Sequence, residues 1–371
     1  MQTYQTICIC GGGCLGHTVA ASISHAGYQV NLLTGHPAQW AHHICVTDPN
    51  NQLIEGDIHT ISNRPEEVIP SADIVLCCLP GYLIQSTLHE IAPYLRPDTE
   101  VGSVVCSSGF FWMARHELGK NRKLFGFQRV PFISRVTEYG HKAELKGYKA
   151  ALKIGGSQNS DLPSLAHFFS EALRTPTSTL RHYLEATLTN SNPILHPARI
   201  YGMLSAYEGD SYDREILFYE EWNERSSEIL IHCDQEFQTI LAALPIQQAE
   251  IPNLLDYYES HDAASLTQKI RSIKAFKGIK MSMIAQPDGR FAVDYSNRYF
   301  TEDIPYGLLI IKSLASLLRI PTPTIDEVIG WMQAHMGKSY LVDGKLTGAD
   351  IKNSGVLPNF QIHTVEQLVN L

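Results

Sequence analysis

Apolar runs and helix-like stretches alternate along the first half of the chain. Residues 6–10 (TICIC) form a short apolar run that ends in three glycines, and helical spacing then continues to Ala26. Gly27 ends this helix, and residues 28–34 (YQVNLLT) are predicted as a second strand. Residues 72–79 (ADIVLCCL) are apolar throughout, as in a parallel strand that is covered on both faces.

The same alternation continues after this third strand. A helix is predicted over residues 82–94 and a strand over residues 100–106. Later strands are predicted over residues 125–129 and 148–154, with a closing helix over residues 162–173. Strands that alternate with helices are typical of a parallel, doubly wound sheet.

The pattern changes after about residue 185. Helical spacing recurs there in four stretches, residues 215–244, 265–276, 305–318 and 325–336. The 371 residues also exceed the size at which a single core stops growing, about 250–300 residues. We therefore predict two domains, an α/β domain with a doubly wound, mainly parallel sheet over residues 1–184 and a mainly α-helical domain over residues 185–371.

Composition and charge narrow the class of protein. A formal net charge of −9 argues against a nucleic-acid partner and against a membrane surface, because both favour a basic face. The longest apolar run, residues 306–318, is interrupted by Lys312 and is too short to span a bilayer. No basic leader or cleavage site is apparent at the N-terminus. These features predict a cytoplasmic protein.

The eight cysteines do not indicate a disulfide framework. No C-x-x-C pair occurs, and five of them lie in apolar, strand-like stretches, namely Cys8, Cys10, Cys77, Cys78 and Cys106. They are interpreted as small buried side chains in a reducing compartment. No metal site is predicted.

Glycines follow the first predicted strand in the spacing G-x-G-x-x-G. A strand precedes them, a helix follows and a second strand arrives at the expected distance, which is the context of a Rossmann dinucleotide-binding turn. Gly11 would make the tight turn, Gly13 would let the backbone approach a pyrophosphate, and Gly16 would allow close packing of the helix. Cys14 and Leu15 would begin the helix beside the cofactor. A glycine-rich turn without a ligand is the alternative, and the complete strand–helix–strand frame argues against it.

The end of the second strand bears on the choice of cofactor. NAD enzymes usually place Asp or Glu there for the ribose hydroxyls, whereas this chain has Thr34 and His36 and no acid until Asp48. Both side chains could donate hydrogen bonds to a 2′-phosphate, although no arginine is apparent. We therefore predict NADP or NAD, with a lean toward NADP, beside Leu79 and Pro80 at the end of the third strand.

A histidine motif stands where the chain enters the second domain. Residues 189–197 (TNSNPILHP) are expected at an interdomain cleft, where ligands commonly bind. Pro197 suits the first position of a helix with His196 as its cap, and Pro193 with an Asn192 cap also fits. Histidine can donate and recover a proton near neutral pH. A capping or core histidine is the alternative, because the chain has 16 histidines.

An acidic motif lies further along, at residues 298–307 (RYFTEDIPYG). Glu302 and Asp303 precede a helix that is predicted to begin at Pro305. Ordinary acidic charge at a helix N-terminus and a functional carboxylate both explain this pattern.

Four motifs together resemble the opine dehydrogenase family, which includes octopine and nopaline dehydrogenases. They are the glycine turn, N-P-x-x-H-P at 192–197, I-R-S-x-x-A-x-K-G-I at 270–279 and R-Y-x-T-E-D-I-P-Y-G at 298–307. Their order and spacing agree with that family over nearly the whole chain. The resemblance implies an enzyme that joins an α-keto acid to the amino group of an amino acid and reduces the imine with NAD(P)H.

The resemblance also implies roles for three residues. His196 would be the proton donor and acceptor, Asp303 its carboxylate partner, and Asn192 a residue that positions the nicotinamide or the substrate. A carboxylate that hydrogen-bonds one imidazole nitrogen fixes the tautomer and raises the basicity of the other nitrogen.

Candidates for substrate binding are less specific. Arg298 and Arg135 could hold a substrate carboxylate by a bidentate contact, and a structural salt bridge is equally open for either. Ser108 and Gly109, at the end of a predicted strand, are expected to line the keto-acid pocket.

Two rival functions remain. A 2-dehydropantoate-reductase-like enzyme or a hydroxyacid dehydrogenase usually carries a lysine at the entry to the second domain, and residues 189–197 contain none. A non-catalytic nucleotide sensor would need no histidine–aspartate pair. The sequence identifies neither the amino acid nor the keto acid, and it leaves the oligomeric state open, with a homodimer as the candidate assembly.

Overall fold

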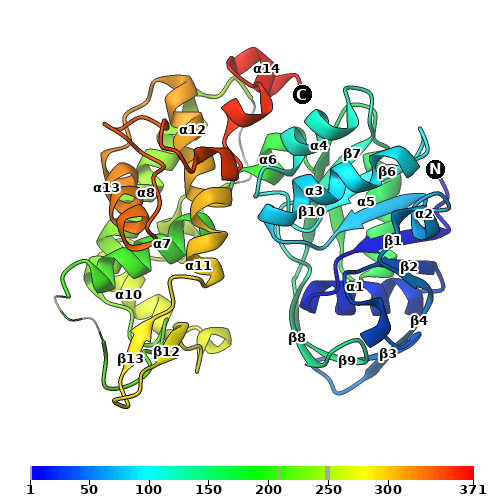
Figure 1. Ribbon diagram of the computed structural model, residues 1–371, viewed down its shortest axis with the longest axis horizontal. Helices are drawn as coiled ribbons and strands as arrows, with labels where there is room; N and C mark the ends of the chain where they lie inside the picture. The colour runs from blue at the N-terminus through cyan, green and yellow to red at the C-terminus, as the bar shows by residue number, and fades with distance from the viewer. Residues whose placement is uncertain (1, 190, 208, 210, 247–250) are drawn as a thin grey trace. The chain divides into compact units, whose positions relative to one another are not determined.

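The computed structural model divides into two compact units (Figure 1). One comprises Met1–Leu188 together with Leu371, and the other comprises Thr189–Asn370. The residues described are 2–189, 191–207, 209, 211–246 and 251–371. Asn190, within the histidine motif, lies outside them. The boundary expected after residue 184 falls inside α6 (Tyr183–Thr187), a helix of the first unit.

An eleven-stranded sheet forms the first unit, and its centre is parallel. β1 (Thr6–Cys10) pairs in parallel with β2 (Gln29–Leu33) on one side and with β5 (Ile74–Cys77) on the other. β6 (Glu100–Ser103) and β7 (Leu124–Phe127) continue the parallel order beyond β5. All four residues of β5 are buried, as its unbroken apolar run predicts.

Helices cover this sheet on both faces. α1 (Cys14–His25) connects β1 to β2, and α3 (Gly81–Ile91) connects β5 to β6 in the opposite direction from β1. Right-handed crossovers that move in opposite directions put their helices on opposite faces. α1 contacts α5 (Leu162–Ala172), while α3 contacts α4 (Phe110–Leu118) and the short α2 (Pro65–Val68). The predicted doubly wound, mainly parallel sheet is confirmed.

Two hairpins that the sequence pattern did not predict widen the sheet. They are formed by β3 (His43–Thr47) with β4 (Leu53–Ser62) and by β8 (Phe132–Glu138) with β9 (Lys142–Tyr148). The single strand predicted over 148–154 is wrong. β9 ends at Tyr148, and β10 (Leu152–Gly156) begins anew, antiparallel to β7 and parallel to β11 (Thr177–Thr179).

The second unit is mainly α-helical, as predicted. Its longer helices are α7 (Asn192–Leu204), α8 (Glu224–Ala243), α10 (Ala263–Ser272), α12 (Leu309–Leu318) and α13 (Pro323–His335). A Cβ at Gly202 of α7 would lie 2.6 Å from the Cα of Ser226 in α8, so glycine permits this close crossing. Shorter elements are α9 (Leu254–Tyr257), α11 (Arg298–Thr301), α14 (Val365–Val369), β12 (Met283–Ala285) and β13 (Phe291–Val293).

Three helix boundaries that bear on the site differ from the sequence prediction. The helix predicted to begin at Pro305 is α12, which begins only at Leu309, after a π-helical turn at Ile304–Leu308. The helix expected over 215–244 begins only at Glu224, because Ile216–Phe218 hydrogen-bond to Ile279–Met281 and Asn223 caps α8. α7 begins at Asn192 with Pro193 in its first turn, so His196 lies inside the helix rather than at its cap. In the part of the chain that the structure describes, no helix combines the length and the apolar character needed to span a bilayer.

Candidate active site

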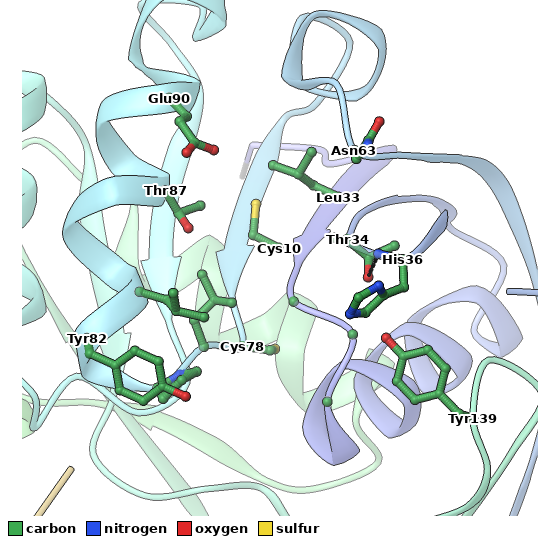
Figure 2. A pocket seen from close by; sticks show the side chains of 17 residues that line it. Cys10, Leu33, Thr34, His36, Asn63, Cys78, Tyr82, Thr87, Glu90 and Tyr139 are labelled. Carbon is green, nitrogen blue, oxygen red and sulfur yellow. Dashed lines mark hydrogen bonds between the residues drawn. The ribbon is translucent and has the colours of Figure 1, made fainter. Parts of the chain in front are cut away.

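A cavity of about 480 Å³ lies at the carboxyl ends of the central strands (Figure 2). Gly11–Gly13 follow β1, Thr34 and His36 follow β2, and Cys78–Pro80 follow β5, and all of them line it. The strand order reverses at β1, which is where open α/β sheets bind their ligands. Six of the predicted cofactor residues therefore meet in one cavity, namely Gly11, Gly13, Thr34, His36, Leu79 and Pro80.

The three motif glycines differ in what a side chain at their position would meet. Gly11 has φ +119°, and a Cβ there would lie 2.6 Å from the carbonyl oxygen of Cys78. A Cβ at Gly16 would lie 2.0 Å from the carbonyl oxygen of Gly11, so this glycine lets α1 pack against the turn. A Cβ at Gly13 would meet nothing within 4 Å. No described residue excludes a side chain at Gly13, so the space beside it is available to a ligand.

The start of α1 suits an anion. Gly13 is the N-cap, and the first backbone N–H groups of a helix lack partners within it and favour negative charge. Among the described residues, Cys14, Leu15 and Gly16 are not part of the cavity wall, since they already belong to the first turn of α1. The arrangement fits the pyrophosphate of a dinucleotide.

His17 ties the glycine turn to the hairpin of β8 and β9. Its Nδ1–H donates to the carbonyl oxygen of Gly13 at 2.9 Å, and its Nε2 accepts from the backbone N–H of Gly140 at 2.8 Å. These partners require the neutral ring, and burial lowers the pKa of His17. The adjacent Tyr139 lines the cavity. Sequence reasoning missed His17 and Tyr139 because the β8–β9 hairpin, which bonds to His17 and carries Tyr139, was not predicted.

The side of the cavity next to β2 carries no carboxylate among the described wall residues. Figure 2 shows the hydroxyl of Tyr139 directed toward Thr34 and His36. The acid in the wall, Glu90, lies on α3 on the other side of the cavity. Asp48 instead accepts hydrogen bonds from the backbone N–H groups of the following turn.

A histidine–aspartate pair is buried in the second unit. The Nδ1–H of His196 donates to Oδ2 of Asp303 at 2.7 Å, across 107 residues of sequence. Asp303 follows α11, where its backbone N–H bonds to the carbonyl oxygen of Arg298. The next turn packs on α7, because a Cβ at Gly307 would lie 2.9 Å from Pro193. The predicted contact is present, and its part in chemistry remains a prediction.

The other imidazole nitrogen also has a partner. Nε2 of His196 lies 3.0 Å from the hydroxyl of Tyr219, and the Tyr299 and Phe218 rings lie 4.6 and 5.6 Å from the imidazole. The imidazole ring is therefore enclosed, and His196 is only 3% exposed. Burial, with Tyr299 and Tyr258 nearby, raises the pKa of Tyr219 above its ordinary range. Sequence reasoning missed Tyr219 because residues 215–223 resembled a helix.

Arg199 fixes the turn that carries Tyr219. It lies one turn after His196 on α7, and its guanidinium donates to the carbonyl oxygens of Phe218 and Glu221 at 2.9 Å each. Burial lowers the pKa of Arg199 to about 10, so the side chain stays cationic at neutral pH. The turn is thus held on both sides of Tyr219.

Two predicted residues of this unit are exposed. Asn192 precedes His196 by one turn on the same face of α7 and accepts from the Ser191 hydroxyl at 3.4 Å. Arg298 begins α11, and within the described residues its guanidinium has no hydrogen-bond or ion-pair partner.

The remaining predicted residues lie in the first unit. Arg135 lies on the exposed side of β8 and donates to the carbonyl oxygen of Ser134. Ser108 and Gly109 precede α4, where Gly109 has φ +91° and close contact with Trp112 excludes a side chain. Among the described residues, none of the three lines the nucleotide cavity, and no cluster of His, Cys, Asp or Glu could hold a metal ion.

Two family models match the chain. That of the NAD/NADP octopine/nopaline dehydrogenase α-helical domain matches residues 179–336, and that of ketopantoate reductase matches residues 7–107.

Whole proteins match over nearly their full lengths. Opine dehydrogenase of Haliotis discus hannai is 27% identical, covering 99% of this chain and 98% of its own. Octopine dehydrogenase of Mizuhopecten yessoensis is 28% identical, covering 98% of both. Solved structures of octopine dehydrogenase with NADH and either agmatine, L-arginine or pyruvate superpose with TM-score 0.87 and 26% identity, covering 99% of this chain and 98% of the other.

The nucleotide cavity, the fold and these similarities define a nicotinamide-dependent oxidoreductase. Within that class, the chain is similar over nearly its whole length to opine and octopine dehydrogenases, and its residues 179–336 match the α-helical domain of the NAD/NADP octopine/nopaline dehydrogenases.

Proposed function

We propose that this enzyme joins an α-keto acid to the amino group of an amino acid and reduces the resulting imine with NAD(P)H. The observation that carries the proposal is the buried hydrogen bond from His196 to Asp303, in the unit that matches the octopine/nopaline dehydrogenase model. The reverse reaction, oxidation of the secondary amine, uses the same groups.

His196 and Asp303 carry out the acid–base chemistry. The bound nicotinamide supplies or accepts the hydride, and the protein supplies the proton. Asp303 accepts the Nδ1–H of His196, which leaves Nε2 as the nitrogen that takes up and releases a proton. The negative charge of the carboxylate also favours the imidazolium form, so His196 can carry the proton that is transferred to the substrate nitrogen or oxygen.

Arg298 and Asn192 bind the substrate. Arg298 is exposed five residues before Asp303, and a guanidinium with free donors suits a carboxylate by a bidentate contact. Asn192 shares a face of α7 with His196, from which its amide can bind the substrate or the nicotinamide. Arginine and pyruvate, present in the octopine dehydrogenase complexes, support this substrate class.

The enzyme accepts NADPH and prefers it to NADH. Thr34, His36 and Tyr139 bring hydrogen-bonding groups to the end of β2, where many NAD enzymes have a carboxylate. A 2′-phosphate there would meet no acidic repulsion from these residues. The octopine dehydrogenase complexes contain NADH, so the preference rests on this chain's own residues.

A ketopantoate-reductase-like activity is the competing function, and it predicts a different product. Reduced cofactor should be oxidised only when an α-keto acid and an amino acid are both present, and mass spectrometry should detect the secondary amine. The screen pairs a panel of amino acids with pyruvate, 2-oxoglutarate and glyoxylate. Oxidation by the keto acid alone, with a hydroxy acid as product, would contradict the proposal.

A further inference from the structure

Tyr219 occupies the imidazole nitrogen that a substrate would need. Asp303 holds Nδ1 of His196, and the hydroxyl of Tyr219 lies 3.0 Å from Nε2. Tyr299 and Phe218 pack beside the ring. With both nitrogens bonded and the ring buried, a substrate cannot receive a proton from Nε2 directly in this arrangement.

We propose that Tyr219 is a catalytic residue whose hydroxyl passes the proton between His196 and the substrate. The proposal rests on the proposed function and extends its acid–base pair to a chain of three side chains, Asp303–His196–Tyr219. It names the atom that delivers the proton, the phenolic oxygen, which the histidine–aspartate pair alone leaves unassigned.

The proton step balances within these groups. As the imine carbon receives the hydride, the Tyr219 O–H bond breaks and an N–H bond forms on the substrate nitrogen. The Nε2–H bond of the His196 imidazolium breaks in turn and restores the phenol. His196 ends neutral, with its Nδ1–H still on Asp303. No phenolate persists, consistent with the burial that disfavours a charged Tyr219.

The surroundings hold the hydroxyl in place. The Tyr219 ring stacks on Phe276 with centroids 4.0 Å apart and planes 17° apart. Arg199 clamps the carbonyl oxygens of Phe218 and Glu221. A relay needs this fixed geometry, because proton transfer requires hydrogen-bond distances at each step.

The hydroxyl also lies within the electrostatic influence of Arg298. The positive charge of that guanidinium acts to lower the pKa of Tyr219, against the larger effect of burial. The residue proposed to bind the substrate carboxylate therefore acts electrostatically on the hydroxyl that is proposed to deliver the proton. Among the described residues, the titratable groups that face the His196 imidazole are Asp303, Tyr219 and Tyr299.

Tyr219→Phe removes the hydroxyl and keeps the ring stacking. It should lower kcat by about 10²-fold or more, in the range of general acid–base catalysis, with NADH affinity within about twofold of wild type. Tyr201→Phe is the matched control, because Tyr201 is also a buried tyrosine whose hydroxyl bonds Glu327 rather than His196. That variant should keep kcat near wild type.

The pH profile separates a relay from simple packing. In Tyr219→Phe the imidazolium loses a hydrogen bond that is stronger than that of the neutral ring, so the alkaline limb of kcat/KM for imine reduction, which needs the imidazolium, should move to lower pH. Fluorotyrosine at position 219, which lowers the pKa of the phenol and keeps its shape, should also shift the profile. It serves as the second variant if Tyr219→Phe fails to fold.

Histidine ¹⁵N NMR gives a readout that needs no substrate. The Nε2 resonance of His196, assigned with His196→Gln, should shift in Tyr219→Phe and not in Tyr201→Phe. A wild type that forms no secondary amine would overturn the proposed function and the relay together, whatever the spectrum. If the wild type is active and the Tyr219 variants keep its full kcat and its pH profile, the relay alone would be overturned.

Discussion

His17 accepts a hydrogen bond from the backbone N–H of Gly140 at 2.8 Å, so the residue after the glycine motif joins the cofactor turn to the β8–β9 hairpin. The bond requires an unprotonated Nε2, and burial lowers the pKa of His17 from its ordinary 6.5. Below about pH 6.5 the unfolded chain binds a proton that the folded protein resists. This contribution to stability is therefore lost as the pH falls from about 6.5 toward the lower folded pKa.

Replacing His17 should reduce this pH dependence. In His17→Asn, the Gly140 N–H loses its partner, which costs about 1–3 kcal/mol if it stays buried. The fall in Tm between about pH 7.5 and about pH 5 should become shallower than in wild type. His167→Asn, at an exposed histidine of α5, is the control and should keep the wild-type slope. An unchanged slope in His17→Asn would assign the pH dependence to other groups.

Gly13→Val tests the cofactor turn without disturbing the core. A Cβ at this position would lie more than 4 Å from every described residue other than its chain neighbours, so the variant should fold. Its side chain would occupy the space in which the pyrophosphate approaches the backbone. Calorimetry should find cofactor affinity reduced at least tenfold, about 1.4 kcal/mol. Gly147→Val, at another glycine with open space around it, should bind the cofactor normally. Wild-type affinity in folded Gly13→Val would exclude this turn as the pyrophosphate site.

Local patterns predicted the first unit well where strand and helix alternate without interruption. The strands β1, β2, β5 and β6 and the places of Gly11 and Gly16 follow from apolar runs and glycine spacing. The two hairpins do not, because β3, β8 and β9 mix buried with exposed residues and lack an unbroken apolar run. Tyr139, in the turn between β8 and β9, was therefore not predicted to line the cavity.

The second unit was predictable through its motifs rather than through its periodicity. Residues 215–223 have helical spacing, but their backbone groups bond to residues 279–281 and to Arg199, which are distant in sequence. Tertiary contacts overrode local preference there, and Tyr219 lies in this turn. The His196–Asp303 contact was found because both residues belong to motifs of a known family, with no local signal of their pairing.

Thr34→Asp should reverse the cofactor preference. Wild type is expected to have a higher kcat/KM with NADPH than with NADH. A carboxylate at the end of β2 would repel a 2′-phosphate and could accept bonds from the ribose hydroxyls. The ratio of kcat/KM values for the two cofactors is the measurement. A wild-type ratio that favours NADH by more than about tenfold, or 1.4 kcal/mol, would contradict the proposed preference.

Arg298→Ala should weaken substrate binding. Hydrogen bonds to charged groups contribute about 1.5–3 kcal/mol, so loss of a bidentate contact should raise KM for a substrate carboxylate by about 10²-fold. Arg298→Lys should recover only part of this loss, because an ammonium lacks the planar pair of donors. Cofactor affinity should not change in either variant. A KM within about threefold of wild type in Arg298→Ala would remove this residue from the substrate site.

His196→Ala and Asp303→Ala test whether the two residues act as one unit. Each single variant should lower kcat by about 10²–10⁴-fold with little change in cofactor affinity, because the acid–base step loses its proton carrier or the carboxylate that orients it. The two side chains share a 2.7 Å hydrogen bond. The double variant should therefore be barely slower than either single variant, as expected for groups whose effects are not additive.

Removing His196 or Asp303 leaves the polar side chain of the other buried without its hydrogen-bond partner. The stability of each variant must therefore be measured together with its kcat. Asp303→Asn is the conservative variant: it keeps the volume and a hydrogen bond to Nδ1, but its amide favours the other tautomer of His196 if the NH₂ group faces the ring. We expect it to lose most of the kcat lost by Asp303→Ala while its Tm stays closer to wild type. If the losses of the single variants instead multiply in the double variant, His196 and Asp303 contribute independently, and the pair has no shared role in proton transfer.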